Sequence, residues 1–216
     1  MPRNKHPEET VKKILDVSLK LFLEKGYENT TVLDIVGSLG GLTRGAFYHH
    51  FKSKEEVLDA IFEKNAGDMR LFEQAQHMEG LNGLERIKML IKVTLKANID
   101  NVRRRDVSNL ALSLAENPRF MAEQIKSNQE VAALMAPMIA EGMADGSIKP
   151  GNPNFLAELF MLLANFWLFP TYFPASEEQT FEKALMIKDI FESLGCPLID
   201  EEVGEIFTQA YDLMTW

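Results

Sequence analysis

The spacing of apolar residues predicts helices along the whole chain. In the first segment, apolar side chains recur mainly at steps of three and four, which places them on one face of a helix. This stripe consists of Val11, Ile14, Leu15, Leu19 and Phe22. Gly26 follows the stripe and favours helix termination. Because no convincing run of alternating β-branched residues occurs, the sequence predicts an all-α fold.

The segment from residue 30 to residue 54 contains two short amphipathic helices separated by glycine. Thr31 and Asp34 have the spacing of a helix cap, and Thr43 can cap a second helix after the break at Gly40-Gly41. A bracing helix, a tight turn and a second helix in this order predict a helix-turn-helix, which places its second helix in the DNA major groove. The sequence therefore predicts an N-terminal three-helix head that binds DNA.

Longer helices are predicted after the head. Ser53 and Glu56 form a capping box for a fourth helix, and we expect the head to join the rest of the chain through a continuous helix near residues 54–75. The three arginines at positions 103–105 are expected to cap the C-terminus of a helix, where positive charge is favourable. Side-chain caps predict further helix starts at Asn117-Pro118, Asn152-Pro153 and Ser176.

We expect two domains that differ in charge. They are a helix-turn-helix DNA-binding domain at residues 1–53 and a larger helical ligand-binding and dimerisation domain at residues 54–216. Residues 1–54 hold nine Lys and Arg against six Asp and Glu, a net charge of +3, whereas the remaining residues carry −12. A mildly basic head on an acidic body suits a protein that presents one end to DNA. Chance is the alternative explanation for so small an excess.

The sequence predicts neither a secreted nor a membrane protein. Charged residues interrupt the N-terminal apolar stretch, which argues against a secretory signal. The most apolar run, Phe155–Phe169, falls short of the ~20 residues that a membrane span needs and ends at Pro170, so a buried core helix explains it better. The single cysteine, Cys196, favours a reducing compartment. We therefore expect a cytoplasmic protein.

The polar residues of the second short helix are candidates for DNA contacts. Arg44 lies at the start of that helix, where base contacts concentrate, and arginine can bond the O6 and N7 atoms of guanine together. Gly45 would let the backbone approach DNA closely, and lysine, tyrosine and histidine side chains could hold phosphates. The predicted DNA-binding residues are Thr31, Thr43, Arg44, Gly45, Tyr48, His49, His50, Lys52 and Lys54. The alternative is that the tyrosine only packs and that the histidines and lysines form a solvated surface.

This segment resembles the TetR (tetracycline-repressor) family of bacterial transcriptional regulators. The resemblance extends over about residues 8–62. It is carried by Lys13-Ile14-Leu15, Leu21-Phe22, Gly26-Tyr27, Thr30-Thr31-Val32, Asp34-Ile35 and the run from Gly45 to Leu58. It implies that Tyr48, His50 and Lys54 hold DNA and that Thr43 with Arg44 reads bases. Leu39-Gly40-Gly41-Leu42 is one residue longer than the turn usual in this family, and a longer turn can tilt the recognition helix.

The resemblance also implies how the rest of the chain works. It implies an all-helical body, a homodimer joined through its last long helices, and a small-molecule pocket whose occupant changes the spacing of the two heads. Two heads that read an inverted repeat must meet successive major grooves, about 34–36 Å apart. The effector would have to bind the conformer that does not fit DNA better than the one that does.

The body is rich in methionine and aromatic residues, which can line an adaptable apolar pocket. The candidate ligand-binding residues are Met135, Met138, Phe160, Phe166, Trp167 and Tyr172. The alternative for each is ordinary core or the seam between two subunits. No HExxH, GxxxxGK[ST] or GxGxxG motif occurs, so we expect no enzyme, no catalytic residues, no metal site and no cofactor.

Together these observations predict a ligand-responsive transcriptional repressor. It would bind a palindromic operator in double-stranded DNA as a homodimer, and a small apolar or amphipathic effector would release it. The alternative is a helical binding module for an apolar ligand or protein partner without specific DNA recognition. A helical enzyme is a third and weaker hypothesis, because the sequence names no substrate.

Overall fold

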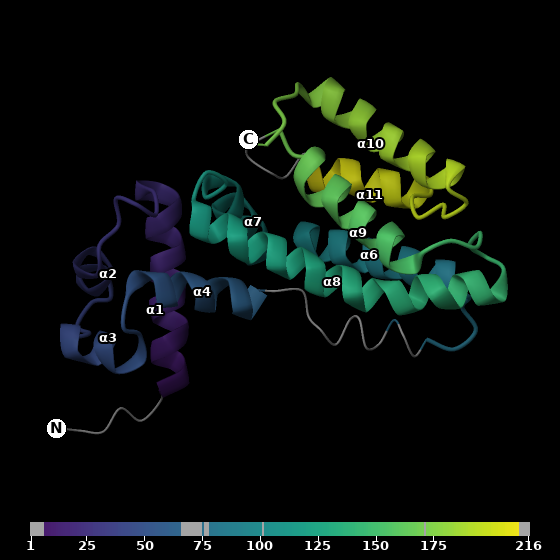
Figure 1. Ribbon diagram of the computed structural model, residues 1–216. Helices are drawn as coiled ribbons and strands as arrows, with labels where there is room; N and C mark the ends of the chain where they lie inside the picture. Colours follow the sequence, from purple (N-terminus) through teal and green to yellow (C-terminus); the bar gives the residue numbers. More distant parts are fainter. Residues whose placement is uncertain (1–6, 66–74, 76–77, 101, 171, 212–216) are drawn as a thin grey trace. The chain divides into compact units, whose positions relative to one another are not determined.

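The computed structural model describes residues 7–65, 75, 78–100, 102–170 and 172–211 (Figure 1). In these residues all regular secondary structure is helical, which confirms the predicted all-α class. Their contacts divide them into two compact units, which we call the head unit and the body unit. Each unit is described separately below.

The head unit contains four consecutive helices and one later helix. They are α1 (Pro7–Lys25), α2 (Val32–Ser38), α3 (Arg44–His50), α4 (Lys54–Asn65) and α7 (Val102–Ser113). α1 lies at the centre, because it contacts α2, α4 and α7. It buries most of the apolar stripe predicted from the sequence, including Ile14 and Phe22. The compact unit is thus larger than a helix-turn-helix, and the functional boundary between residues 53 and 54 stays a prediction.

The start of α4 differs in detail from the predicted capping box. The Ser53 hydroxyl accepts a bond from the Glu56 amide at 3.3 Å, as expected. The Glu56 carboxylate, however, accepts from the amide of Lys52 instead of that of Ser53. α4 is described as far as Asn65, and residues 66–74 of the predicted continuous helix lie outside the described residues.

The prediction for the three arginines is wrong. They were expected at a helix C-terminus, but α7 begins at Val102, so residues 103–105 lie in its first turn. Burial explains the difference, because Val107 and Leu110 of α7 are buried in the head unit, where α7 contacts α1 and α4. The free energy of burying such side chains, about 1.5–3 kcal/mol each, exceeds the unfavourable effect of positive charge near a helix N-terminus.

The body unit contains the remaining described helices. They are α6 (Gly83–Asp100), α8 (Pro118–Asp145), α9 (Pro153–Leu162), a π-helical turn η1 (Leu163–Trp167), α10 (Glu177–Ser193) and α11 (Glu201–Tyr211). α8 contacts both α6 and α9, and α6 also contacts α11. The predicted caps Asn117, Asn152 and Ser176 all accept bonds from the first turns of their helices. α8 continues through Pro137 to the left-handed cap at Gly146.

The apolar run predicted as one buried helix changes its hydrogen-bonding pattern partway along. α9 ends at Leu162 and η1 follows, in which the amide of Leu168 donates to the carbonyl of Leu163 at 2.9 Å. The i to i+5 spacing of this bond defines a π-turn. Nothing in the apolar periodicity signals this change.

The N-terminus of α6 is held closely against the C-terminal end of α8. The Gly83 amide donates to the Asp145 carboxylate at 2.7 Å, and the Leu84 amide donates to the Ser147 hydroxyl at 3.4 Å. Bonds from Ser147 and Gly83 hold the pKa of Asp145 below its usual value. A Cβ atom on Gly83 would lie 2.2 Å from the backbone nitrogen of Gly142, so glycine is needed here.

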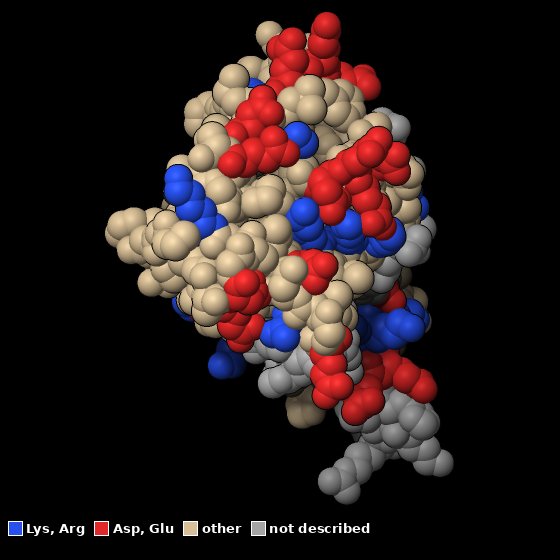
Figure 2. Space-filling model, turned by 90° about the vertical axis from the view of Figure 1, so that its right-hand side faces the viewer, with Lys and Arg blue, Asp and Glu red and all other residues tan. Residues whose placement is uncertain are grey.

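The surface of the body unit carries ion pairs between its helices. On the face shown in Figure 2, acidic side chains form several patches, and basic side chains lie directly beside one of them. Lys92 of α6 contacts the carboxylates of Asp200 at 3.1 Å and Glu202 at 2.6 Å. These contacts, with Glu202 contributing most, raise the pKa of Lys92. These ion pairs hold the start of α11 against α6.

Candidate nucleic-acid interface

α2 begins with a complete capping box. The Thr31 hydroxyl accepts from the Asp34 amide at 3.2 Å, and the Asp34 carboxylate accepts from the Thr31 amide at 2.8 Å. The ammonium of Lys25, at the end of α1, lies 2.8 Å from the same carboxylate. Lys25 and then Thr31 hold the pKa of Asp34 well below its usual range. The predicted cap is therefore confirmed, and it also ties α2 to α1.

The turn between α2 and α3 depends on two glycines. Gly40 and Gly41 have φ angles of +57° and +102°, in the left-handed region that side chains other than glycine rarely adopt. Leu39, which precedes them, is buried and holds the end of α2 on the head. Two consecutive residues in the left-handed backbone conformation thus form the turn, which the sequence analysis describes as one residue longer than usual.

α3 separates an apolar inner side from a polar outer side. The Thr43 hydroxyl accepts from the Ala46 amide at 3.2 Å, as predicted for the cap. Phe47 is fully buried, and Phe51 is nearly so, with their ring centroids 6.2 Å apart. The predicted DNA-binding residues of α3 and its cap are exposed except for His50, which is half-buried: Thr43, Arg44, Gly45, Tyr48 and His49.

Two side chains on the outer side of α3 contact each other. The guanidinium carbon of Arg44 lies 5.5 Å from the centroid of the Tyr48 ring, one helical turn away. This distance is within the range of a cation–π contact, which limits the conformations that Arg44 can adopt. The position of a Cβ atom on Gly45 is open, because the nearest atom, the Thr43 hydroxyl oxygen, is 4.0 Å away. The backbone of α3 is therefore accessible at Gly45.

Three of the predicted phosphate ligands differ in their surroundings. The Thr31 hydroxyl lies 2.6 Å from Asp34 and donates to it. The Lys54 ammonium donates to the carbonyls of Tyr27 at 2.8 Å and Glu28 at 3.2 Å. Lys52 is exposed. The helix-turn-helix therefore places most predicted contacts on one short helix, whereas Thr31 and Lys54 already have partners inside the head unit.

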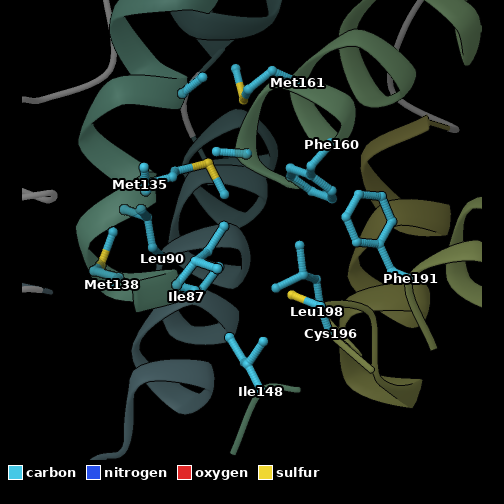
Figure 3. Packing of buried hydrophobic residues seen from close by; sticks show 14 of the residues in the cluster. Ile87, Leu90, Met135, Met138, Ile148, Phe160, Met161, Phe191, Cys196 and Leu198 are labelled. Carbon is cyan, nitrogen blue, oxygen red and sulfur yellow. The ribbon is translucent and has the colours of Figure 1, made fainter. Parts of the chain in front are cut away.

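Three of the six candidate ligand-binding residues belong to the packed core of the body unit. Met135, Met138 and Phe160 are all buried. Figure 3 shows Met135 and Met138 near the aliphatic side chains of α6 and Phe160 beside Phe191, with the two ring centroids 5.6 Å apart. The three candidates, Phe191 and the aliphatic residues of α6 together come from four helices. Such an arrangement is expected for a core as well as for a ligand site.

The other three candidates lie in η1 or in the segment that connects η1 to α10, which we call the junction. The rings of Phe166 and Tyr172 are half-buried, with centroids 5.4 Å apart. Burial raises the pKa of the Tyr172 hydroxyl. Trp167 packs partly against the core, and the Lys183 ammonium lies 5.6 Å from its ring centroid. The structure thus divides the predicted set into a core group and a junction group.

Other kinds of site have little support in the described residues. They contain no cluster of three His, Cys, Asp or Glu side chains that could hold a metal ion. None of their helices is both long enough and apolar enough to span a bilayer. Cys196 is fully buried, and burial raises the pKa of its thiol to about 11. A thiol in that state is a poor nucleophile and serves packing.

Comparison with known proteins identifies the family. The family model described as bacterial regulatory proteins, tetR family, matches residues 14–61. The HTH-type transcriptional repressor KstR2 of Rhodococcus jostii is 30% identical over 68% of this chain and 72% of its own length. KstR2 of Mycolicibacterium smegmatis is 29% identical over 63% of this chain, and the alignment spans only 66% of that relative.

Solved structures extend the likeness over more of the chain. A TetR-family transcriptional regulator from Pectobacterium atrosepticum superimposes with a TM-score of 0.62, covering 89% of this chain and 97% of that one at 22% identity. The SmeT–triclosan complex superimposes with a TM-score of 0.64, covering 93% and 91% at 18% identity. At such identities the structures show a shared fold, and the sequence relatives are regulators, not enzymes. The chain therefore belongs to the TetR family of bacterial transcriptional regulators.

Proposed function

We propose that this protein is a ligand-responsive transcriptional repressor that binds a palindromic operator as a homodimer. The observation that carries the proposal is the outer side of α3. Polar and basic residues are exposed there, while Phe47 and Phe51 anchor the helix from the inside. A helix that presents such a side from a helix-turn-helix is suited to the major groove. A regulator of this kind would act in the cytoplasm, where its DNA is.

Within this proposal, the residues of α3 divide into base and phosphate contacts. Arg44 reads a guanine, with Tyr48 holding its guanidinium in place, and Thr43 contacts a neighbouring base. Gly45 allows close approach of the sugar-phosphate backbone. Tyr48 itself, His50, Lys52, Lys54 and Thr31 hold phosphates. His49 faces outward on the exposed side of α3.

Exposed apolar residues on α9 and α10 support the proposed homodimer. The residues are Phe155, Leu162, Leu185 and Met186, with exposed fractions of 67%, 55%, 62% and 54%. Single exposed apolar residues are ordinary, but four on two helices favour a surface that a second copy covers. Leu162→Glu with Leu185→Glu is expected to give a monomer in sedimentation. Ile125→Glu, at an exposed position on α8, is the matched control.

A small apolar or amphipathic effector would release the protein from DNA. The proposed contacts are Met135, Met138, Phe160, Phe166, Trp167 and Tyr172. The SmeT–triclosan complex, which shares the fold, supports a small-molecule ligand for this chain as well. A preference of about 1–3 kcal/mol for the conformer that does not fit DNA would lower operator affinity 5–150-fold.

The direct test is selection of bound duplexes from a random DNA pool. We expect a palindromic consensus whose half-sites are about one helical turn apart. Binding to the selected duplex should weaken steeply with salt, and Arg44→Ala should weaken it by about 1–3 kcal/mol and relax the preference at one position in each half-site. If no sequence is enriched, the proposal fails, and a helical binding module without DNA specificity takes its place.

A further inference from the structure

Lys183, in the second turn of α10, differs from the other partly buried lysines of the body unit. Among the described residues of that unit, half-buried lysines occur at positions 88, 92, 183 and 188. Three of them pair with carboxylates, as Lys188 does with Glu192 at 2.7 Å. Lys183 forms no ion pair with a described residue. Because a lysine that is withdrawn from water is usually paired with an anion, this one lacks an expected partner.

The ammonium of Lys183 is held in place by neutral groups. It lies 5.6 Å from the centroid of the Trp167 ring and 5.8 Å from that of the Phe173 ring, both within the range of a cation–π contact. It also donates to the Phe173 carbonyl at 2.9 Å. These groups leave the positive charge without a counter-charge, and two of its three N–H groups have no partner among the described residues. The cation is therefore both positioned and available to an anion.

Tyr172, the residue before Phe173, adds a second polar group at the junction. Its ring is half-buried and lies against Phe166, with the two centroids 5.4 Å apart. Within the described part of the chain its hydroxyl makes no hydrogen bond, although the hydroxyl of a buried tyrosine usually has a partner. A cation, a hydroxyl and several aromatic rings thus lie in one short segment, and both polar groups lack the partners that such groups usually have.

We propose that the junction binds the carboxylate of an amphipathic small molecule, with Lys183 as the counter-charge and the rings of Trp167 and Phe173 against the apolar part. Trp167 also packs partly against the core of the body unit, so the apolar part can extend toward the core residues proposed as effector contacts. The inference rests on the proposed function, because it names the chemical class of the effector.

The charges around Lys183 favour a ligand with a single negative charge. One ammonium neutralises one carboxylate. Exposed glutamates in the first two turns of α10, at positions 177, 178 and 182, would repel a dianion such as a phosphate monoester. A carboxylate attached to an apolar group satisfies both the lone cation and the aromatic rings beside it.

Phenylbutyrate and its uncharged amide, phenylbutyramide, are suitable probes, because they share the apolar part and differ in charge. Isothermal titration calorimetry of the full chain without DNA measures both affinities. The unchanged protein should bind the acid about tenfold more tightly than the amide, a difference of the size expected for one hydrogen bond between charged groups. Lys183→Met should lower the affinity for the acid to that for the amide, and Lys183→Arg should keep the preference.

Lys188→Met is the matched control. It removes the same charge from the same helix, at a lysine that already has a carboxylate partner. This variant should keep the preference for the acid. Equal affinities of the unchanged protein for the two probes, or no measurable binding of either, would overturn the proposal. An equal loss of preference in Lys183→Met and Lys188→Met would also overturn it, because the effect would then follow net charge.

Tryptophan fluorescence tests the place of binding. Trp216→Phe leaves Trp167 as the only tryptophan of the chain. Its emission should change as phenylbutyrate saturates the protein. Calorimetric binding without a change in this emission would place the probe elsewhere and overturn the assignment to the junction.

Operator binding tests whether the junction is the effector site. Saturating phenylbutyrate should weaken the binding of the unchanged protein to its selected duplex and leave that of Lys183→Met unaltered. If bound phenylbutyrate does not change the affinity for DNA, the junction does not hold the effector. If the unchanged protein binds no duplex at all, the proposed function fails, while the calorimetric comparison still decides whether Lys183 binds a carboxylate.

Discussion

Two glycines at helical positions, Gly83 in the body unit and Gly45 in the head unit, have opposite surroundings. In the body unit, Gly83 begins α6 so close to α8 that a Cβ atom would overlap backbone atoms of Gly142 and Met138. In the head unit, a Cβ atom on Gly37 or Gly45 would meet nothing closer than 4.0 Å. Glycine in a helix costs roughly 0.5–1 kcal/mol relative to alanine. Packing explains that cost at Gly83, whereas nothing within the head explains it at Gly45, which favours a partner outside the chain.

The largest expected effect is that of Gly83→Ala. The new Cβ atom would lie 2.2–2.6 Å from backbone atoms, which cannot rotate away, and we expect a loss of about 3 kcal/mol or more in the free energy of unfolding. Thermal unfolding measures this loss. Gly204→Ala in α11, where a Cβ atom meets nothing within 4 Å, is the control and should be neutral or stabilising. Equal behaviour of the two variants would refute the close approach of α6 and α8.

Two buried hydroxyl groups, one in each unit, should also respond differently to their removal. Ser18 of α1 is fully buried, and its hydroxyl has no hydrogen-bond partner. Ser18→Ala removes the cost of this buried group and should stabilise the protein by about 1 kcal/mol in denaturant unfolding. Thr180 of α10 is equally buried, but its hydroxyl donates to the Ser176 carbonyl at 2.9 Å. Thr180→Val removes this bond and should therefore destabilise the protein. A loss of stability in both variants would contradict the difference in hydrogen bonding between the two hydroxyl groups.

Gly45→Ala should separate stability from function. Because the Cβ position is open, alanine should stabilise the head by roughly 0.5–1 kcal/mol. The same methyl group would stand between α3 and the DNA, so operator affinity should fall in a binding titration. Gly37→Ala in α2 is the matched control, because a Cβ atom there also meets nothing within 4 Å. This variant should stabilise the head without changing its affinity for the operator. If Gly45→Ala binds the operator as well as the unchanged protein, Gly45 does not serve close approach.

The smallest expected effect is the change in stability of the head with pH that arises from the Asp34 carboxyl. Lys25 and Thr31 lower the pKa of its carboxyl in the folded state, so it binds fewer protons folded than unfolded. Its contribution to stability is complete above its unfolded pKa, about 4, and is lost as the pH falls below that value. Asp34→Asn should thus lower the Tm at neutral pH, and the difference from the unchanged protein should shrink in acid. A constant difference between about pH 6 and about pH 3 would exclude this ionisation.

Local signals in the sequence predicted most of the head. The caps Thr31 and Thr43 and the break at Gly40-Gly41 act on their immediate neighbours, so their consequences could be inferred from spacing alone. The contact of Lys54 with Tyr27 could not, because 27 residues separate them and no periodic pattern relates them. Periodicity likewise did not predict that α7 packs in the head unit.

The body was less predictable for the same physical reason. Asn117 and Asn152 correctly predicted where α8 and α9 begin. Which methionine and aromatic residues become part of the core, however, depends on contacts with helices that are distant in sequence. Met138 is fully buried, whereas Trp167, with the same apolar character, is only partly so. Apolar residues alone therefore do not distinguish a core from a ligand site.

Methylation interference tests most directly whether the outer side of α3 reads DNA in a symmetric dimer. A methyl group on guanine N7 blocks the atom that Arg44 is proposed to bond. We predict that methylation of two guanines, placed symmetrically about the centre of the selected duplex, abolishes binding of the unchanged protein, and that Arg44→Ala is insensitive to the same two methyl groups. Binding that ignores guanine methylation, or that depends on a single unsymmetrical position, would contradict the account.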